Sequence, residues 1–417
     1  MKISKIKGFA DLYGTESDRF TLMENQARKI FGACGFTELR TPILEYTDLF
    51  KRSIGEETDV VNKEMYTLTT EKGRSYSLRP EATAGVMRAY IENALYSKNQ
   101  ICRLFTTGPM FRHERPQKGR LRQFHQINCE CLGSESPLAD ADMITMLMRF
   151  LHALGLQRIK LEINSLGCKQ CRPVFRQALR QFLDALPEDN LCEDCRRRRT
   201  TNPLRVLDCK HEECKKLIEK APRITDYLCE DCQRHFAVVL DILRQQHVEA
   251  HLNPKLVRGL DYYCRTTFEV VSGEIGSQSA VAGGGRYDGL ISALGGPDIP
   301  GIGFACGMER LALLLPEPEP EVPDFYLLVM EEKDSSRAFL LLQKLREHGL
   351  RGEMNFTCQS FKSLMRQADK SQALFCLIFG SEESASNSLT IKSMRDGTQQ
   401  SVPLDHVLPF LQEHCHE

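Results

Sequence analysis

The chain has 417 residues, of which 41% are hydrophobic and 27% charged, as in an ordinary globular protein of two or three domains. No apolar run approaches the roughly 18 residues of a membrane span, and no apolar signal core follows the first lysines, so we expect a cytoplasmic protein without membrane contact. The formal charge of -1 means that a polyanionic ligand must bind to a local basic patch.

The predicted elements begin with an amphipathic helix at residues 18–34, where apolar side chains recur at helical spacing and Gly35 follows as a stop. A β-favouring stretch occupies 35–50, and its Pro42 is typical of a strand edge. Strand patterns recur in three further stretches, the last of which passes into a helix: 157–167, 256–273 and 301–315. The segment Cys168–Cys232 reads as helical, so we predict a mixed sheet with an insertion.

Residues 316–323, "PEPEPEVP", alternate proline with glutamate and therefore predict an extended, solvated linker. Beyond this linker, three strand patterns alternate with two amphipathic helical patterns. Residues 323–417 are therefore expected to form a small α/β domain.

The segment 111–133, "FRHERPQKGRLRQFHQINCECLG", contains four arginines, one lysine and two histidines. Its arginines offer planar forks suited to phosphate oxygens, and Phe124 adds an aromatic face for a base. Alone, such a run usually marks a solvated turn, and neither a GxxxxGK[ST] loop nor a GxGxxG after a strand is present.

Motifs elsewhere in the chain indicate a function for this basic segment. "TPILE" at 41–45, "FRHERPQKGRLRQFHQ" at 111–126 and "GFACGMERL" at 303–311 resemble the three motifs of class II aminoacyl-tRNA synthetases. "LRPEATAG", "RGLDYY" and "GGGRYDGL" make the chain similar to one family of that class, the histidyl-tRNA synthetases. The resemblance covers nearly the whole chain. One departure is Ala82, where the family commonly has glycine.

The resemblance implies an α+β fold. A class II catalytic domain at 1–320 would be built on a six-stranded antiparallel sheet and carry a helical cysteine-rich insertion at about 166–248. A C-terminal α/β anticodon-binding domain would occupy 323–417. The implied protein is a homodimer that uses histidine, tRNA(His) and ATP with Mg²⁺.

The resemblance also implies roles for residues that bind ATP. Arg112 would hold the α-phosphate, Phe124 and Arg310 would sandwich the adenine, and Glu114 would orient the adenine amine. Arg258 of "RGLDYY" would stand where other class II enzymes use a metal ion and neutralise the α-phosphate as the histidine carboxylate attacks. The implied catalytic residues are Arg258, Arg112 and Gln126.

For histidine, the family implies carboxylates for the ammonium group, an amide for the carboxylate and two tyrosines for the imidazole. Tyr262 is expected to pack rather than to contact the substrate. The implied histidine-binding residues are Glu81, Thr83, Gln126, Glu130, Arg258, Tyr263 and Tyr287.

Eight of the 17 cysteines form four close pairs in the insertion. In a cytosolic protein, CxxC pairs at this density suggest structural zinc bound by four thiolates, although buried cysteines that only pack are the alternative. A basic run at 196–199 either touches tRNA or forms a solvated face. The candidate ligands are Cys168, Cys171, Cys192, Cys195, Cys209, Cys214, Cys229 and Cys232.

Three functions are compared. The first is a histidine–tRNA ligase. The second is a catalytically silent relative that acts as a regulatory subunit of histidine biosynthesis; such relatives lack the C-terminal domain and have eroded motifs. The third is a module that senses uncharged tRNA, which would need extra domains. The intact motifs and the C-terminal domain favour the ligase.

Overall fold

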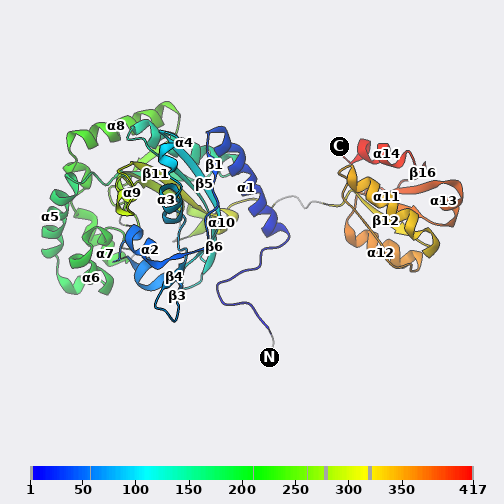
Figure 1. Ribbon diagram of the computed structural model, residues 1–417, viewed down its shortest axis with the longest axis horizontal. Coiled ribbons are helices and arrows are strands. Elements are labelled where there is room, and N and C mark those ends of the chain that lie inside the picture. Colours follow the sequence, from blue (N-terminus) through cyan, green and yellow to red (C-terminus); the bar gives the residue numbers. More distant parts are fainter. Residues whose placement is uncertain are drawn as a thin grey trace. The chain divides into compact units, whose positions relative to one another are not determined.

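The computed structural model describes residues 3–56, 58–209, 211–260, 262–276, 280–317 and 322–415. The chain forms two compact units, Met1–Pro318 and Glu319–Glu417, each with its own hydrophobic core (Figure 1). Part of the predicted linker, residues 318–321, lies outside the described residues. Among the helices of the described chain, none combines the length and the apolar character that crossing a membrane requires.

The first unit is built on an eight-stranded sheet with the order β1-β5-β6-β11-β10-β9-β7-β8. The six strands from β5 to β7 in that order are antiparallel to their neighbours, while β1 and β8 add short parallel pairs at the two edges. The antiparallel sheet implied by the sequence is thereby confirmed. The strands are β1 (Thr37–Glu38), β5 (Cys102–Phe111), β6 (Gln123–Leu132), β7 (Lys160–Ser165), β8 (Ala250–Leu252), β9 (Cys264–Val271), β10 (Ala280–Arg286) and β11 (Gly301–Gly307).

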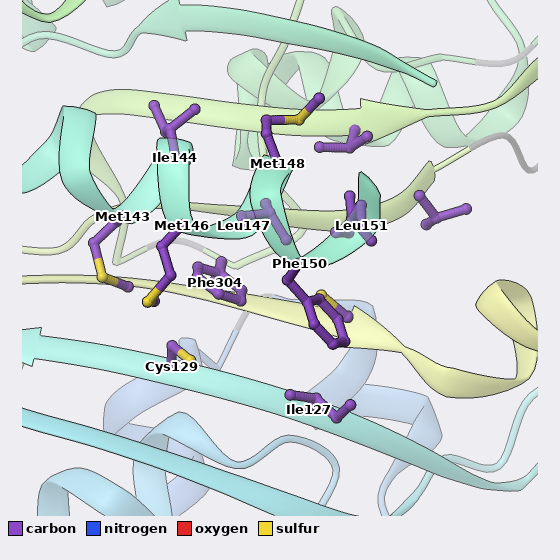
Figure 2. Packing of buried hydrophobic residues seen from close by; sticks show 14 of the residues in the cluster. Ile127, Cys129, Met143, Ile144, Met146, Leu147, Met148, Phe150, Leu151 and Phe304 are labelled. Carbon is purple, nitrogen blue, oxygen red and sulfur yellow. The ribbon is translucent and has the colours of Figure 1, made fainter. Parts of the chain in front are cut away.

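Long helices cover one face of this sheet. The predicted N-terminal helix is present as α1 (Thr15–Ala33), which packs beside α4 (Pro137–Ala153), and α4 packs in turn beside α8 (Glu230–Gln245). Figure 2 shows the apolar side chains of α4 above Ile127 and Cys129 of β6 and Phe304 of β11. The ring of Phe31 lies 5.2 Å from that of Phe150 and 5.9 Å from that of Phe304, so α1, α4 and the sheet share one core.

The two central strands present different chemistry to the two faces, because successive side chains of a strand point to opposite sides. On β6, Ile127 and Cys129 belong to the core, whereas the alternate residues Gln126, Asn128 and Glu130 line a cavity on the other face. On β11, the residues on the cavity face are small, namely Gly303, Ala305 and Gly307. The sheet is therefore hollowed on its second face.

The first unit also contains shorter elements. They are β2 (Leu44–Tyr46), α2 (Thr47–Ile54), the π-helix η1 (Val60–Glu64), β3 (Thr67–Thr69), β4 (Ser75–Leu78), α3 (Thr83–Glu92), η2 (Leu95–Ser97), η7 (Gly273–Ile275), α9 (Leu290–Ala293) and α10 (Met308–Ala312). The strand pattern predicted through Phe50 is wrong from Thr47 onward, where α2 begins. The buried residues of α2 are Thr47, Phe50, Ser53 and Ile54, a helical spacing that packs the helix against Ala84 of α3.

The insertion is helical, as predicted, and lies to one side of the sheet (Figure 1). Its apolar core contains Phe175, Leu179 and Leu183 together with buried cysteines. In the basic run, Arg198 pairs with Asp59 at 2.9 Å. The elements are α5 (Cys171–Asp184), η3 (Glu188–Asn190), α6 (Glu193–Thr201), η4 (Pro203–Val206), α7 (Glu212–Leu217), η5 (Ile218–Lys220) and η6 (Ile224–Tyr227), and α8 completes it.

The second unit is an α/β domain with the strand order β13-β12-β14-β15-β16. Helices α11 and α14 pack on one face of its sheet and α12 on the other. The three strands and two helices predicted here are present, and the short strands β13 and β16 were not predicted. The elements are β12 (Phe325–Val329), η8 (Glu332–Asp334), α11 (Ser335–Glu347), β13 (Gly352–Met354), α12 (Phe361–Ser371), β14 (Phe375–Phe379), α13 (Ser381–Ser386), β15 (Ser388–Ser393), β16 (Gln399–Pro403) and α14 (Val407–His414).

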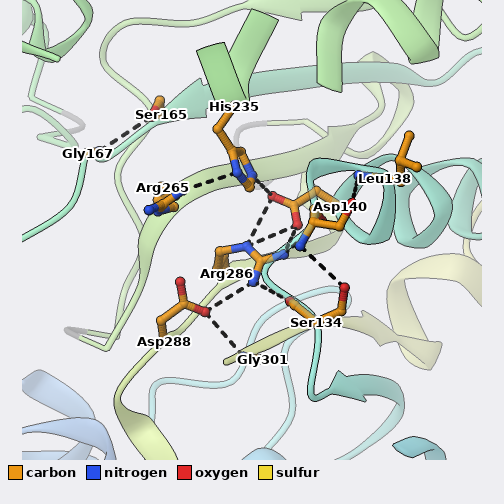
Figure 3. A network of polar contacts seen from close by, with 11 residues as sticks. Ser134, Leu138, Asp140, Ser165, Gly167, His235, Arg265, Arg286, Asp288 and Gly301 are labelled. Carbon is orange, nitrogen blue, oxygen red and sulfur yellow. Dashed lines mark hydrogen bonds and ion pairs between the residues drawn. The ribbon is translucent and has the colours of Figure 1, made fainter. Parts of the chain in front are cut away.

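A buried ion pair ties the sheet to two of the covering helices (Figure 3). Arg286, the last residue of β10, and Asp140 of α4 both have fully buried side chains and form a bidentate ion pair. His235 of α8 bonds the same carboxylate at 2.8 Å, and Arg265 of β9 bonds the other nitrogen of that imidazole at 3.2 Å. Burial alone would raise the pKa of Asp140, but His235 and Arg286 hold it below its usual value.

We predict that Asp140→Ala lowers the free energy of unfolding by about 3–5 kcal/mol, because it removes the fully buried carboxylate that pairs with Arg286 and leaves the buried guanidinium with only the partly exposed Asp288 as an anionic partner. Asp142→Ala is the matched control, since this residue lies on the same helix with an exposed side chain, and it should cost less than about 0.5 kcal/mol. Urea unfolding followed by circular dichroism measures both. Equal stability of the two variants would contradict a structural role for the pair.

Candidate active site

The hollowed face of the sheet holds a cavity of about 300 Å³. Every residue predicted to bind ATP or histidine lines it, although these residues come from five separate stretches of the chain. The predicted residues in the lining are Glu81, Thr83, Arg112, Glu114, Phe124, Gln126, Glu130, Arg258, Tyr263, Tyr287 and Arg310. The structure therefore brings the predicted set together in one place.

One end of the cavity contains two buried carboxylates. Glu81 precedes α3 and accepts hydrogen bonds from the backbone N–H groups of Thr83 and Ala84, both at 2.8 Å. Glu130 on β6 accepts one bond from the hydroxyl of Thr83 at 2.7 Å and another from the hydroxyl of Tyr287. The four side chains form a connected acidic wall that suits an ammonium group.

Burial has the largest effect on the pKa values of the two carboxyl groups in this wall. It raises the pKa of Glu130 to about 8, against the hydrogen bonds from Tyr287 and Thr83 that favour the carboxylate. Burial also raises the pKa of Glu81, although the backbone N–H groups of α3 oppose the shift. Two adjacent carboxyls without a counter-charge favour protonation. A cationic ligand would restore the charged forms.

Ala82, the departure from the family pattern, fits this wall without strain. Its backbone lies in the right-handed helical region, with φ of −93° and ψ of −31°. A residue with a β-carbon adopts this conformation freely. The alanine therefore leaves Glu81 and Thr83 in place.

Gln126 lies on the same strand as Glu130, two pleats away. Among the described residues, its buried carbonyl oxygen Oε1 has no hydrogen-bond partner. Because the two ends of an amide exchange by rotation of its last torsion, either its oxygen or its NH₂ group faces the cavity. A buried amide with an orphan atom is suited to a polar ligand.

Arg258 also lines the cavity, and its guanidinium contacts two neighbours. Its guanidinium forms an ion pair with Glu269 of β9, and its charge lies 5.5 Å from the centre of the Tyr263 ring. Burial alone would lower the pKa of Arg258, but Glu269 and the tyrosines raise it. A β-carbon at Gly283 would collide with the guanidinium, so the glycine leaves the room that the arginine occupies.

Another part of the lining is cationic and aromatic. The guanidinium of Arg112 lies 5.2 Å from the centre of the Phe124 ring and donates to the carbonyl of Pro80 at 2.9 Å. Arg310 donates to the carbonyl of Ala280 at 2.6 Å, and Glu114 pairs with Arg120. These residues combine positive charge with an aromatic ring, the chemistry of a nucleotide site.

Several residues of the cavity were not predicted. Glu269 had no distinguishing motif, because a carboxylate in a strand gives no sequence signal. Gly303 sits opposite Glu130 in the β6–β11 register, and a β-carbon there would overlap the carboxylate. Tyr262, predicted to pack, does contact Tyr263 with ring centres 4.6 Å apart, but it also faces the cavity.

The cysteine pairs assemble into two clusters in the insertion. In each cluster the four Sγ atoms lie within 4.8 Å of one another. We call the first cluster the neck tetrad and the second the tip tetrad. The neck tetrad is Cys168, Cys171, Cys229 and Cys232, and the tip tetrad is Cys192, Cys195, Cys209 and Cys214.

Comparison with known proteins places the chain in a family. The family model described as histidyl-tRNA synthetase matches residues 8–311, and the model of an anticodon-binding domain matches 324–414. The histidine–tRNA ligases of Oleidesulfovibrio alaskensis and Nitratidesulfovibrio vulgaris are each 59% identical over 406 residues, which is 97% of this chain and 97% of theirs.

Solved structures agree with this result. The apo histidyl-tRNA synthetase of S. aureus is 33% identical with a TM-score of 0.82, and the match covers 99% of this chain and 100% of that one. A Bacillus halodurans protein described as an ATP phosphoribosyltransferase regulatory subunit/histidyl-tRNA synthetase shares the fold at 18% identity, with a TM-score of 0.67 over 91% of this chain and 100% of its own. With its family model matched over residues 8–311, this chain belongs to the histidyl-tRNA synthetase family.

Proposed function

We propose that the protein is a histidine–tRNA ligase. In the first step, histidine and ATP react to histidyl-adenylate and pyrophosphate. In the second, the histidyl group moves from the adenylate to the 3′ end of tRNA(His). The observation that carries this proposal is one cavity lined both by an acidic wall and by cationic and aromatic residues, in a chain 59% identical to histidine–tRNA ligases.

The geometry suits the first step. Glu81 and Glu130, with Thr83 between them, are the proposed partners of the substrate ammonium group. Gln126 is the proposed partner of its carboxylate, and Tyr263 and Tyr287 recognise the imidazole. A site that hydrogen-bonds a ring nitrogen rejects amino acids that lack one, because its own buried polar groups would then be unpaired.

The cationic residues of the cavity are the proposed binding groups for the phosphate of ATP. Arg112 and Arg258 are the proposed partners of the α-phosphate, so that the two anionic reactants, carboxylate and phosphate, meet between fixed positive charges. The carboxylate oxygen attacks the α-phosphorus, and pyrophosphate leaves on the opposite side. Phe124 and Arg310 sandwich the adenine, and Glu114 accepts from its amine. ATP enters as its Mg²⁺ complex.

The remaining parts of the proposal concern assembly and partners. Residues 323–417 are the proposed anticodon-binding domain, and 1–320 the catalytic domain with an insertion at about 166–248. A homodimer is supported by the exposed apolar side chains of Ile43, Leu44 and Tyr46 at the "TPILE" segment. The cytoplasm is the proposed location, and structural zinc is the proposed occupant of the two tetrads.

The test of the activity is histidine-dependent exchange of pyrophosphate into ATP by the purified protein, followed by charging of tRNA(His) with histidine. Exchange that needs histidine and no other amino acid would support the ligase. Absence of exchange with a folded protein would favour the regulatory-subunit alternative. That alternative has little support, because relatives named as ligases match over 97% of the chain, including the anticodon-binding domain.

We predict that Arg258→Ala slows adenylate formation by about a hundred- to a thousandfold, the usual cost of removing one preorganised charge from a transition state. Histidine binding should weaken far less, because the acidic wall stays intact. Arg258→Lys is the matched variant that keeps the charge and should recover part of the rate. Pyrophosphate exchange gives the rate and equilibrium dialysis the affinity. Near-normal exchange by the alanine variant would contradict the assigned role.

The raised pKa of Glu130 predicts a pH dependence. Below about pH 8 the free enzyme carries this carboxyl protonated, and the proton must leave before an ammonium group binds. The kcat/KM for histidine should therefore rise with pH and level off above about 8, while kcat/KM for ATP at saturating histidine should not follow this curve. Tyr287→Phe removes a bond to the carboxylate and should move the plateau to higher pH. A flat histidine profile would contradict the assignment.

A further inference from the structure

The sulfur atoms of the two tetrads are spaced as in a metal site. Four thiolates about 2.3 Å from a tetrahedral zinc ion lie about 3.8 Å apart. The Sγ of Cys168 lies 3.6 Å from that of Cys171 and 3.8 Å from that of Cys229, and the Sγ of Cys192 lies 3.8 Å from that of Cys209. All eight cysteines are free thiols without disulfides.

Backbone N–H groups also point at the sulfurs. The N–H of Cys229 lies 3.1 Å from the Sγ of Cys171, and the N–H of Cys192 lies 3.2 Å from the Sγ of Cys214. These donors cross between the pairs of each tetrad, and they stabilise thiolates more than thiols. Four sulfurs at mutual contact with such donors are the arrangement of a closed, structural zinc site rather than of ordinary apolar packing.

Each tetrad lies next to an arginine that reaches the active site. Arg172, the residue after Cys171, donates to the carbonyl of Tyr263 at 3.0 Å. Arg205, in η4 between the two pairs of the tip tetrad, donates to the carbonyl of Arg258 at 2.9 Å. The two acceptors are the first and last residues of "RGLDYY". The insertion therefore holds this segment, which we call the 258–263 loop, at both ends.

Short main-chain bonds connect the neck tetrad to the same region. Leu166 and Gly167, just before Cys168, exchange backbone hydrogen bonds with Arg265 at 2.6 and 2.9 Å. A β-carbon at Gly167, whose φ is +63°, would press against Cys171, so the chain passes close to the cluster. In the tip tetrad, the N–H of Cys209 bonds the carbonyl of Val206, the neighbour of Arg205. Arg172 is therefore adjacent in sequence to a cysteine of the neck tetrad, and the residue next to Arg205 is hydrogen-bonded to a cysteine of the tip tetrad.

We propose that two zinc ions, one in each tetrad, fix the insertion so that Arg172 and Arg205 position the 258–263 loop for histidine and ATP. Arg172 and Arg205 are positioning residues, because they touch carbonyls of the loop and not the cavity. The inference rests on the proposed function for its kinetic consequences. Its structural part, metal content and order of the loop, stands independently of that function.

The first measurement is elemental analysis of protein purified without chelator, and two zinc equivalents per chain are expected, one for each tetrad. Metal is then removed with a thiol reagent and a chelator, the reagent is reversed, and zinc is added back to part of the sample. A zinc content near zero in the purified protein would overturn the proposal. Recovery of the protection of the 258–263 loop without added zinc would also overturn it.

The second measurement is hydrogen–deuterium exchange of the peptide that covers the 258–263 loop. Exchange should increase after metal removal and in Arg172→Ala and Arg205→Ala, and return when zinc is restored to the wild-type protein. Arg180→Ala is the matched control, because Arg180 lies on α5 like Arg172 but is exposed and has no described contact to the loop. Unchanged protection in both positioning variants would overturn the proposal even if zinc is bound.

The third measurement is the KM for histidine in pyrophosphate exchange. Each of the two arginine variants should raise it about tenfold, the size of one charge-assisted hydrogen bond, with smaller effects on the KM for ATP. In metal-free protein the same substitutions should add little further, since metal and arginine act through one arrangement. Additive effects would show that the metal does not act through these arginines. No exchange in wild-type protein would refute the proposed function, while zinc content and loop protection would still test the inference.

Discussion

The buried pair of Arg286 and Asp140 is the contact on which the catalytic unit depends. The pair sits where three elements meet, because Arg286 ends β10, Asp140 belongs to α4 and His235 brings in α8, the last helix of the insertion. A buried charge without its partner is costly, so the three elements have one arrangement that satisfies the guanidinium. Tyr287 follows Arg286 directly and places its hydroxyl on Glu130, so the packing constraint also sets the acidic wall.

The two faces of the sheet differ in their chemistry. One face is filled by Met, Leu, Ile and Phe side chains from α1 and α4, and the opposite face keeps its polar residues because small residues on β11 leave space above them. Gly303 and Gly283 each leave room for one side chain of the cavity. A β-carbon at Gly303 would overlap Glu130, and a β-carbon at Gly283 would overlap Arg258.

The sequence predicted the local features and the residues that lie in motifs. The helical insertion and the α/β C-terminal unit were accessible from continuous patterns, whereas the antiparallel sheet and the cavity residues around Arg112 and Glu130 were implied by motifs that resemble a known family. Contacts between residues far apart in the chain could not be predicted from the sequence. Arg286 and Asp140 are 146 residues apart, and Glu269 has no motif of its own. Helix α2 was misassigned because its burial against α3, rather than its β-branched composition, decides its structure.

The nesting of the two tetrads sets an order for building the insertion. The contact between Cys192 and Cys214 joins residues 22 apart, whereas the contact between Cys168 and Cys229 spans 61 residues and encloses the tip tetrad entirely. Because closing a loop costs more entropy as it lengthens, the inner cluster forms more readily, and its formation shortens the segment that the outer one must close. During synthesis the inner set of ligands, which ends at Cys214, is also complete before the outer set, which ends at Cys232. This order favours closing the tip tetrad before the neck tetrad, so the contact of Arg172 with Tyr263 is fastened last.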